Sequence, residues 1–85
     1  MRHARPEDLD RVDGLLASLR TLAGLTEKKR GVFYRGSKAF LHFHEHDGEI
    51  VCDVRLDGAE FDRRTVTAAS AQRTLVADVR RALSA

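Results

Sequence analysis

Three histidines and one aspartate are the residues in this chain whose types and spacing could support chemistry. His42, His44 and His46 alternate along the stretch AFLHFHEHDGEIVCDVRL (39–56), and Asp53 follows them. Zinc accepts both imidazole nitrogen and carboxylate oxygen ligands. Histidines two positions apart on a strand have Cα atoms about 6.6 Å apart, so their rings can converge on one ion. We therefore consider metal binding by His42, His44 and Asp53; His46 lies too far from His42 to share that ion.

A predicted β-hairpin positions these side chains. Asp47-Gly48 favours a two-residue turn with positive φ at both positions, joining strands over 39–46 and 49–56. Counting back from this turn pairs His46 with Glu49, His44 with Val51, Phe43 with Cys52, His42 with Asp53, and Leu41 with Val54. Alternate side chains on a strand point to opposite faces. The histidines and Asp53 therefore share one face, and an apolar set shares the other: Leu41, Phe43, Cys52 and Val54.

Aromatic residues are also expected on the histidine face. A Gly36-Ser37 turn would place Phe33, from a strand over 31–35, beside Phe40. The predicted sheet-face binding patch comprises Phe33, Phe40, His42, His44, Asp53 and Arg55. Exposed aromatic rings could stack on nucleic-acid bases while arginines meet phosphates, although the net charge is only +2. Contiguous apolar area also marks protein interfaces, so a homodimer through this open face is the other partner expected.

Catalytic machinery is not evident. Cys52, the single cysteine, is expected on the core face, away from the histidines, as a packed and inert thiol. Asp53 and Asp62 could be neighbours across the next strand pair, within a solvated ladder of arginines. No phosphate-loop, dinucleotide-binding or nucleophile-elbow pattern occurs. We expect no catalytic residues and no cofactor, and we assign a binding role of undetermined chemistry.

The remaining sequence predicts a single domain over residues 1–85. Apolar residues at three- and four-residue steps indicate amphipathic helices at both ends of the chain. The expected elements are a helix over 6–22, a charged connector over 26–30, strands over 31–35, 39–46, 49–56 and 59–66, and a helix over 68–83. The fold class is thus α+β: a two-layer α-β-β-β-β-α domain whose antiparallel meander carries both helices on one face.

The cysteine content and hydropathy of the sequence indicate the cellular compartment. One cysteine excludes an intrachain disulfide, and the sequence has neither a long apolar run nor an apolar signal region near its start. We expect a cytoplasmic protein with no membrane association.

The first half of the chain resembles the MmcQ/YjbR-like family of small bacterial proteins. Family members often have a helix ending at an LPG turn, a nearby glutamate, an aromatic strand and a GK-x-F motif. The parallels here are Leu22-Ala23-Gly24, Glu27, Phe33 and Gly36-Ser37-Lys38-Ala39-Phe40. Ala23 replaces the family proline, and Ser37 interrupts the Gly–Lys pair. The resemblance implies a compact two-layer fold and a family often labelled DNA-binding, and it transfers no catalytic residues.

Overall fold

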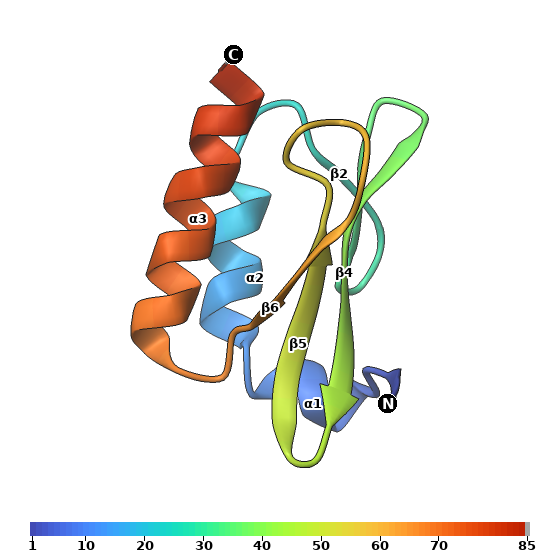
Figure 1. The fold of residues 1–85 in the computed structure, drawn as a ribbon, viewed down its shortest axis with the longest axis vertical. Helices are drawn as coiled ribbons and strands as arrows, with labels where there is room; N and C mark the ends of the chain where they lie inside the picture. The colour runs from blue at the N-terminus through green and yellow to red at the C-terminus, as the bar shows by residue number, and fades with distance from the viewer. Residues whose placement is uncertain (85) are drawn as a thin grey trace.

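A layer of helices covers one face of an antiparallel sheet in the computed structural model, which describes residues 1–84 (Figure 1). This arrangement confirms the predicted α+β class. The described elements, in chain order, are β1 (Arg2–His3), α1 (Pro6–Asp10), α2 (Asp13–Arg20), β2 (Thr26–Lys29), β3 (Val32–Arg35), β4 (Lys38–His46), β5 (Glu49–Val54), β6 (Asp62–Thr65) and α3 (Ala69–Ser84).

The sheet is a meander in the order β2-β3-β4-β5-β6, with β1 added beside β4. Strand β2 corrects the prediction of a charged connector over 26–30, because Glu27 pairs with Phe33 across the β2–β3 ladder. The segment TEKKR lacks the alternation of apolar and polar residues that predicts a strand, because β2 lies at the edge of the sheet, where a strand can be polar throughout. Strand β1 is two residues long and has no periodicity that a sequence pattern could reveal.

The predicted first helix is divided into α1 and α2 at Arg11–Val12. Val12 has non-helical backbone angles, φ −119° and ψ 26°, and its side chain is buried in the core. The break allows α1 to lie across one end of the sheet while α2 runs beside α3 (Figure 1). Leu9 of α1 and Leu16 of α2 therefore bury against different parts of the same core.

The hairpin register is the predicted one. Asp47 and Gly48 both have positive φ, 50° and 82°, and all five predicted cross-strand pairs of β4 and β5 are present. Leu41, Cys52 and Val54 are consequently fully buried in the hydrophobic core with residues of α2 and α3. Among residues 1–84, no helix combines the length and apolarity needed to cross a membrane.

Cys52 should be chemically inert in the native protein. Its thiol is fully buried, and burial raises its pKa, so the reactive thiolate is suppressed. We expect an aromatic disulfide reagent to leave the folded protein unmodified at pH 8 and to label one thiol per chain in denaturant. Rapid stoichiometric labelling without denaturant would contradict this placement.

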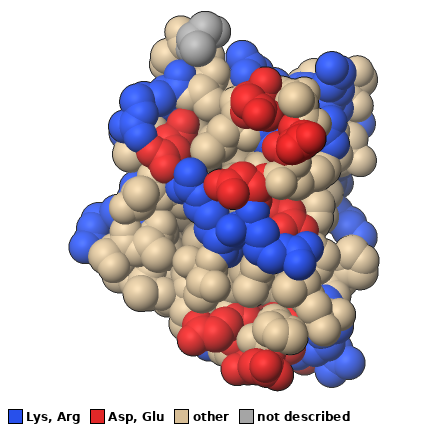
Figure 2. Space-filling view, viewed as in Figure 1, with Lys and Arg blue, Asp and Glu red and all other residues tan. Residues whose placement is uncertain are grey.

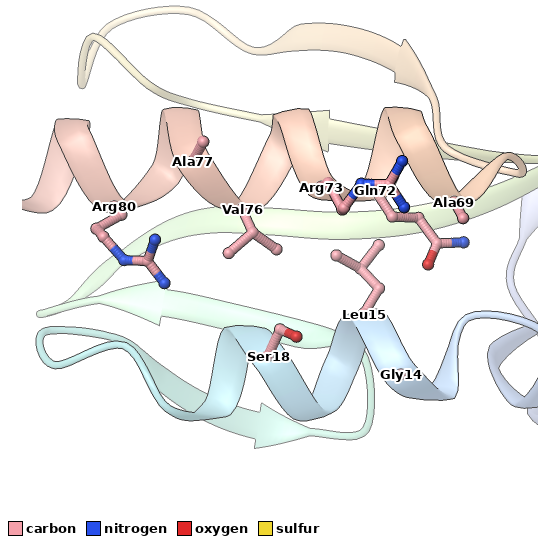
Figure 3. A pocket seen from close by; sticks show the side chains of 9 residues that line it. All are labelled: Gly14, Leu15, Ser18, Ala69, Gln72, Arg73, Val76, Ala77 and Arg80. Carbon is pink, nitrogen blue, oxygen red and sulfur yellow. The ribbon is translucent and has the colours of Figure 1, made fainter.

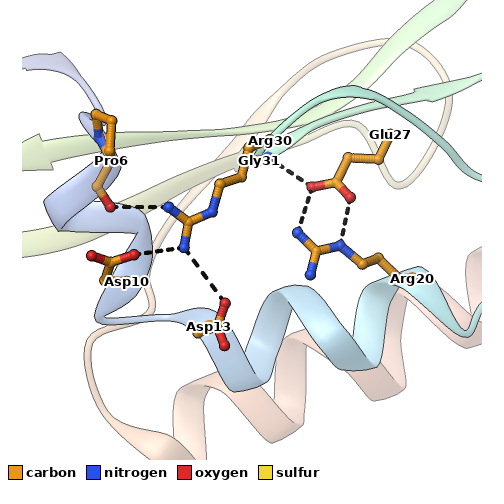
Figure 4. A network of polar contacts seen from close by, with 7 residues as sticks. All are labelled: Pro6, Asp10, Asp13, Arg20, Glu27, Arg30 and Gly31. Atoms are coloured by element: carbon orange, nitrogen blue, oxygen red, sulfur yellow. Dashed lines mark hydrogen bonds and ion pairs between the residues drawn. The ribbon is translucent and has the colours of Figure 1, made fainter.

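Two ionic clusters hold the β2–β3 hairpin against the helices (Figure 4). Glu27 accepts hydrogen bonds from Arg20 Nε at 2.5 Å and from the Gly31 amide at 2.9 Å. Arg30 donates to Asp10 at 2.7 Å and to the Pro6 carbonyl at 3.2 Å. The hairpin is therefore tied to both α1 and α2 close to Gly31.

Gly31 is required at this contact for two reasons. Its φ is 80°, and a Cβ atom there would lie 2.8 Å from Leu9 Cδ2. Gly36 provides a matched control, because its φ is 63° but a Cβ there has nothing within 4 Å. We expect Gly31→Ala to lower the free energy of unfolding by about 1–3 kcal/mol more than Gly36→Ala, the usual cost of overpacking. Equal losses in urea titrations would show that only the positive φ matters.

Asp8 joins the N-terminal strand to α1. Its carboxylate accepts from Arg2 Nη1 at 2.5 Å and from the Arg5 amide at 2.8 Å, and Arg2 also pairs with Glu45 of β4 at 3.5 Å. The hydrogen bond from Arg2, and then that from the Arg5 amide, hold the pKa of Asp8 below its ordinary value.

This lowered pKa predicts a specific loss of stability in acid. The stabilisation from ionised Asp8 is present above the unfolded-state pKa of about 4 and is lost as the pH falls through the lower folded-state pKa. We expect the free energy of unfolding of Asp8→Asn to fall less steeply between about pH 4 and pH 2 than that of the wild type. Parallel pH profiles from urea titrations would refute the role given to Asp8.

Candidate functional site

Asp53 is the centre of a polar cluster on the sheet face that points away from the helices. The β4–β5 register places His42 opposite Asp53, and the β5–β6 register places Arg63 on its other side. Asp53 Oδ2 lies 2.9 Å from His44 Nε2 and 3.3 Å from His42 Nε2. Arg63 donates from Nε to Oδ1 at 2.8 Å and from Nη2 to Oδ2 at 3.1 Å. Only 7% of Asp53 is exposed, so this carboxylate is held by protein groups on both sides.

The charges of this cluster are set mainly by Arg63 and by burial. The hydrogen bond from Arg63 holds the pKa of Asp53 below its ordinary value, against the opposing effect of burial, and the two histidines act in the same direction as Arg63. Burial lowers the pKa of His42 more than the nearby carboxylate of Asp53 raises it. At neutral pH the cluster therefore contains an ionised carboxylate beside a neutral imidazole, which is the form of histidine that ligates metals.

The sequence-predicted trio converges in space. The ligand atoms of His42, His44 and Asp53 all lie within 4.8 Å of one another. Zinc–ligand distances of about 2.0–2.1 Å in a tetrahedron imply ligand separations of about 3.3 Å. The two nitrogen–oxygen distances are 2.9 and 3.3 Å, and the two nitrogens lie within 4.8 Å of one another. His44 Nε2 makes the shorter contact with Asp53, at hydrogen-bond distance. His42 Nε2 lies farther from the same oxygen, at 3.3 Å.

Two residues that sequence reasoning missed border this trio. His3 of β1 pairs with His44, and their ring centroids are 5.1 Å apart. Phe61, in the β5–β6 loop, lies edge-on to the His42 ring at 5.2 Å. A cavity of about 150 Å³ opens beside the cluster and is lined in part by His3 and His42. His3 lies outside every predicted strand. The predicted strand over 59–66 begins only at Asp62, so Phe61 is in the preceding loop and only the folded chain brings it here.

Arg55 remains on this face but makes a different contact from the one expected. Its guanidinium lies over the Phe61 ring, 4.2 Å from the centroid, a cation–π arrangement. Within the described chain, Arg55 Nε is buried and has no hydrogen-bond partner. Asp62 pairs with Val54 rather than Asp53, so Arg63 takes the position in which a second carboxylate was expected.

The predicted placement of Phe33 and Phe40 on the open face is wrong. Both are buried in the hydrophobic core, with 1% and 3% of their surfaces exposed. Phe33 pairs with Leu41 and Tyr34 with Ala39, which leaves Phe40 as an extra residue in β4. Such a β-bulge interrupts the alternation of side chains. Phe40 therefore packs with the core residues under the helices, while Val51 on the histidine face lies outside that cluster.

This correction removes the stacking surface proposed from the sequence. Val51 is also buried, so the apolar patch that suggested a homodimer is not exposed either. Figure 2 shows a band of basic side chains across the middle of one side of the molecule, with acidic side chains bordering it. The binding patch retains His42, His44, Asp53 and Arg55, and its chemistry is that of a polar cluster.

Comparisons with known proteins find no matching family model, no matching curated protein and no matching solved structure. The resemblance to the MmcQ/YjbR-like family stays a prediction.

Proposed function

We propose that this protein binds a divalent transition-metal ion, zinc in the first place, through His42 Nε2, His44 Nε2 and Asp53 Oδ2. The observation that carries the proposal is the convergence of these three ligand atoms within 4.8 Å. Two nitrogen ligands favour zinc and its neighbours over magnesium and calcium, which prefer oxygen.

Arg63 has two opposite effects on this site. It donates to Oδ1 of Asp53 at 2.8 Å and to Oδ2 at 3.1 Å, and so fixes the orientation of the carboxylate beside the imidazoles, as outer-shell partners of metal ligands commonly do. It also brings a positive charge that repels a cation. The Arg63 side chain is 58% exposed, so solvent screens much of that repulsion. We therefore propose moderate affinity, and a function in binding an exchangeable ion.

Three protein ligands leave one position of a tetrahedral ion open. The open position suits exchange of the ion or of a small ligand, in contrast to the four-ligand set of a structural zinc site. His3, next to His44, is the nearest further imidazole. The proposed location is the cytoplasm, where Cys52 would stay reduced. Nucleic-acid binding and homodimer formation stay predictions, and the aromatic residues that first suggested them are buried.

The metal site can be tested with a matched pair of histidine variants. His44 is a proposed ligand, whereas His46 lies two positions away on β4 and is half exposed. In calorimetric titrations with Zn²⁺, we expect the wild type to bind one ion per chain. His44→Ala should lose roughly 100-fold or more in affinity, which exceeds the 10–100-fold loss typical when a residue outside the ligand set is changed. His46→Ala should bind as the wild type does.

Cobalt absorption gives a second readout. Co²⁺ in a four-coordinate site should produce visible bands that disappear in His44→Ala and in Asp53→Asn, while circular dichroism shows that both variants remain folded. Failure of the wild type to bind either ion, or equal losses for the His44 and His46 variants, would overturn the proposal.

A further inference from the structure

A groove runs along the outside of the helical layer, between α2 and α3 (Figure 3). Its volume is about 400 Å³. The lining residues come from these two helices only: Gly14, Leu15, Ser18, Ala69, Gln72, Arg73, Val76, Ala77 and Arg80. The groove is remote from the metal-site face, because the helices cover the opposite side of the sheet.

The floor of the groove is apolar and its walls are low. Leu15 and Val76 project towards one another across it (Figure 3), and Val76 remains partly exposed. Gly14 and Ala77 carry little or no side chain, and a Cβ atom at Gly14 would have nothing within 4 Å. The two helices therefore leave a space that their own side chains do not fill.

Two arginines give the α3 wall of this space a positive charge. Arg73 and Arg80 are seven residues apart, or about two turns, so they lie on the same side of α3. Both are exposed and line the groove. Within residues 1–84, neither guanidinium takes part in a salt bridge or hydrogen bond, whereas Arg81 on the same helix pairs with Asp78. Among the described residues, no acidic residue lines the groove, so the charge of its α3 wall is uncompensated.

The shape and charge define one kind of occupant. From Ala69 to Arg80, α3 rises about 16 Å at 1.5 Å per residue, which matches about three turns of a partner helix. Amphipathic helices bind such grooves through apolar residues on one face, and carboxylates flanking that face would meet Arg73 and Arg80. We propose that the α2–α3 groove docks an acidic amphipathic helix of another protein.

A second copy of this chain fits the groove poorly. Within residues 1–84, α1 is only five residues long, and the apolar sides of α2 and α3 are already buried in the core. Two copies meeting through their grooves would bring the four arginines of their α3 walls together, and like charges in contact are unfavourable. The occupant is therefore a different chain that supplies carboxylates.

A synthetic peptide provides the probe: a labelled amphipathic helix of four turns, with leucines on one face and glutamates on both flanks. Fluorescence anisotropy should show saturable binding, and amide chemical shifts should change in α2 and α3. The same peptide with lysines in place of the glutamates should not bind.

Adjacent arginines on α3 give the matched control. Arg80 lines the groove and Arg81 does not, but reversing either changes the net charge equally. We expect Arg80→Glu to weaken binding of the acidic peptide by about tenfold, and Arg81→Glu by less than about threefold. Gly14→Leu, which fills the groove, should abolish binding, while thermal melts confirm that each variant is folded.

Several results would overturn this proposal. One is failure of the acidic peptide to bind at millimolar protein, and another is equal binding of the lysine peptide. Equal effects of the two charge reversals, or chemical-shift changes confined to the sheet face, would also contradict it. Concentration-dependent self-association that Arg80→Glu alters would assign the groove to a second copy instead. Peptide binding by His44→Ala should equal that of the wild type, because the groove and the metal site are independent.

Discussion

The register of the β4–β5 hairpin is the constraint on which the rest of the structure depends. The two-residue turn at Asp47 and Gly48 has positive φ at both positions, and only one pairing of the strands is compatible with it. A shift by one residue would exchange the faces of every side chain. The turn therefore decides both that Cys52 lies under the helices and that His42 lies opposite Asp53.

Asp53 connects this register to chemistry. A largely buried carboxylate is costly unless it is hydrogen bonded and paired, and Arg63 meets that requirement from the neighbouring strand. Arg63 donates to both carboxylate oxygens, and Oδ2 also lies near two imidazole nitrogens from β4. The same contacts that make the buried charge tolerable thus assemble a ligand set for a metal ion.

The helical layer has a separate role. The break at Val12 divides the N-terminal helix, so α1 covers one end of the sheet and α2 aligns with α3. Small residues along the line where α2 and α3 meet leave an apolar groove with a basic α3 wall. The domain consequently presents two surfaces of different chemistry: a polar cluster on the open sheet face, and a groove on the helical side.

The hydrophobic pattern and turn chemistry were sufficient to predict the α+β class, the hairpin register and the trio of His42, His44 and Asp53, because alternation and a two-residue turn are local properties of the chain. They could not place Phe40, whose position depends on a bulge created by pairing with β3. Nor could they bring His3 to His44, because strand β1 forms only when the N-terminus finds an unpaired stretch of β4. Local sequence thus determined which face each hairpin residue occupies, whereas contacts between distant segments decided what surrounds that face, since those contacts exist only after the chain has folded.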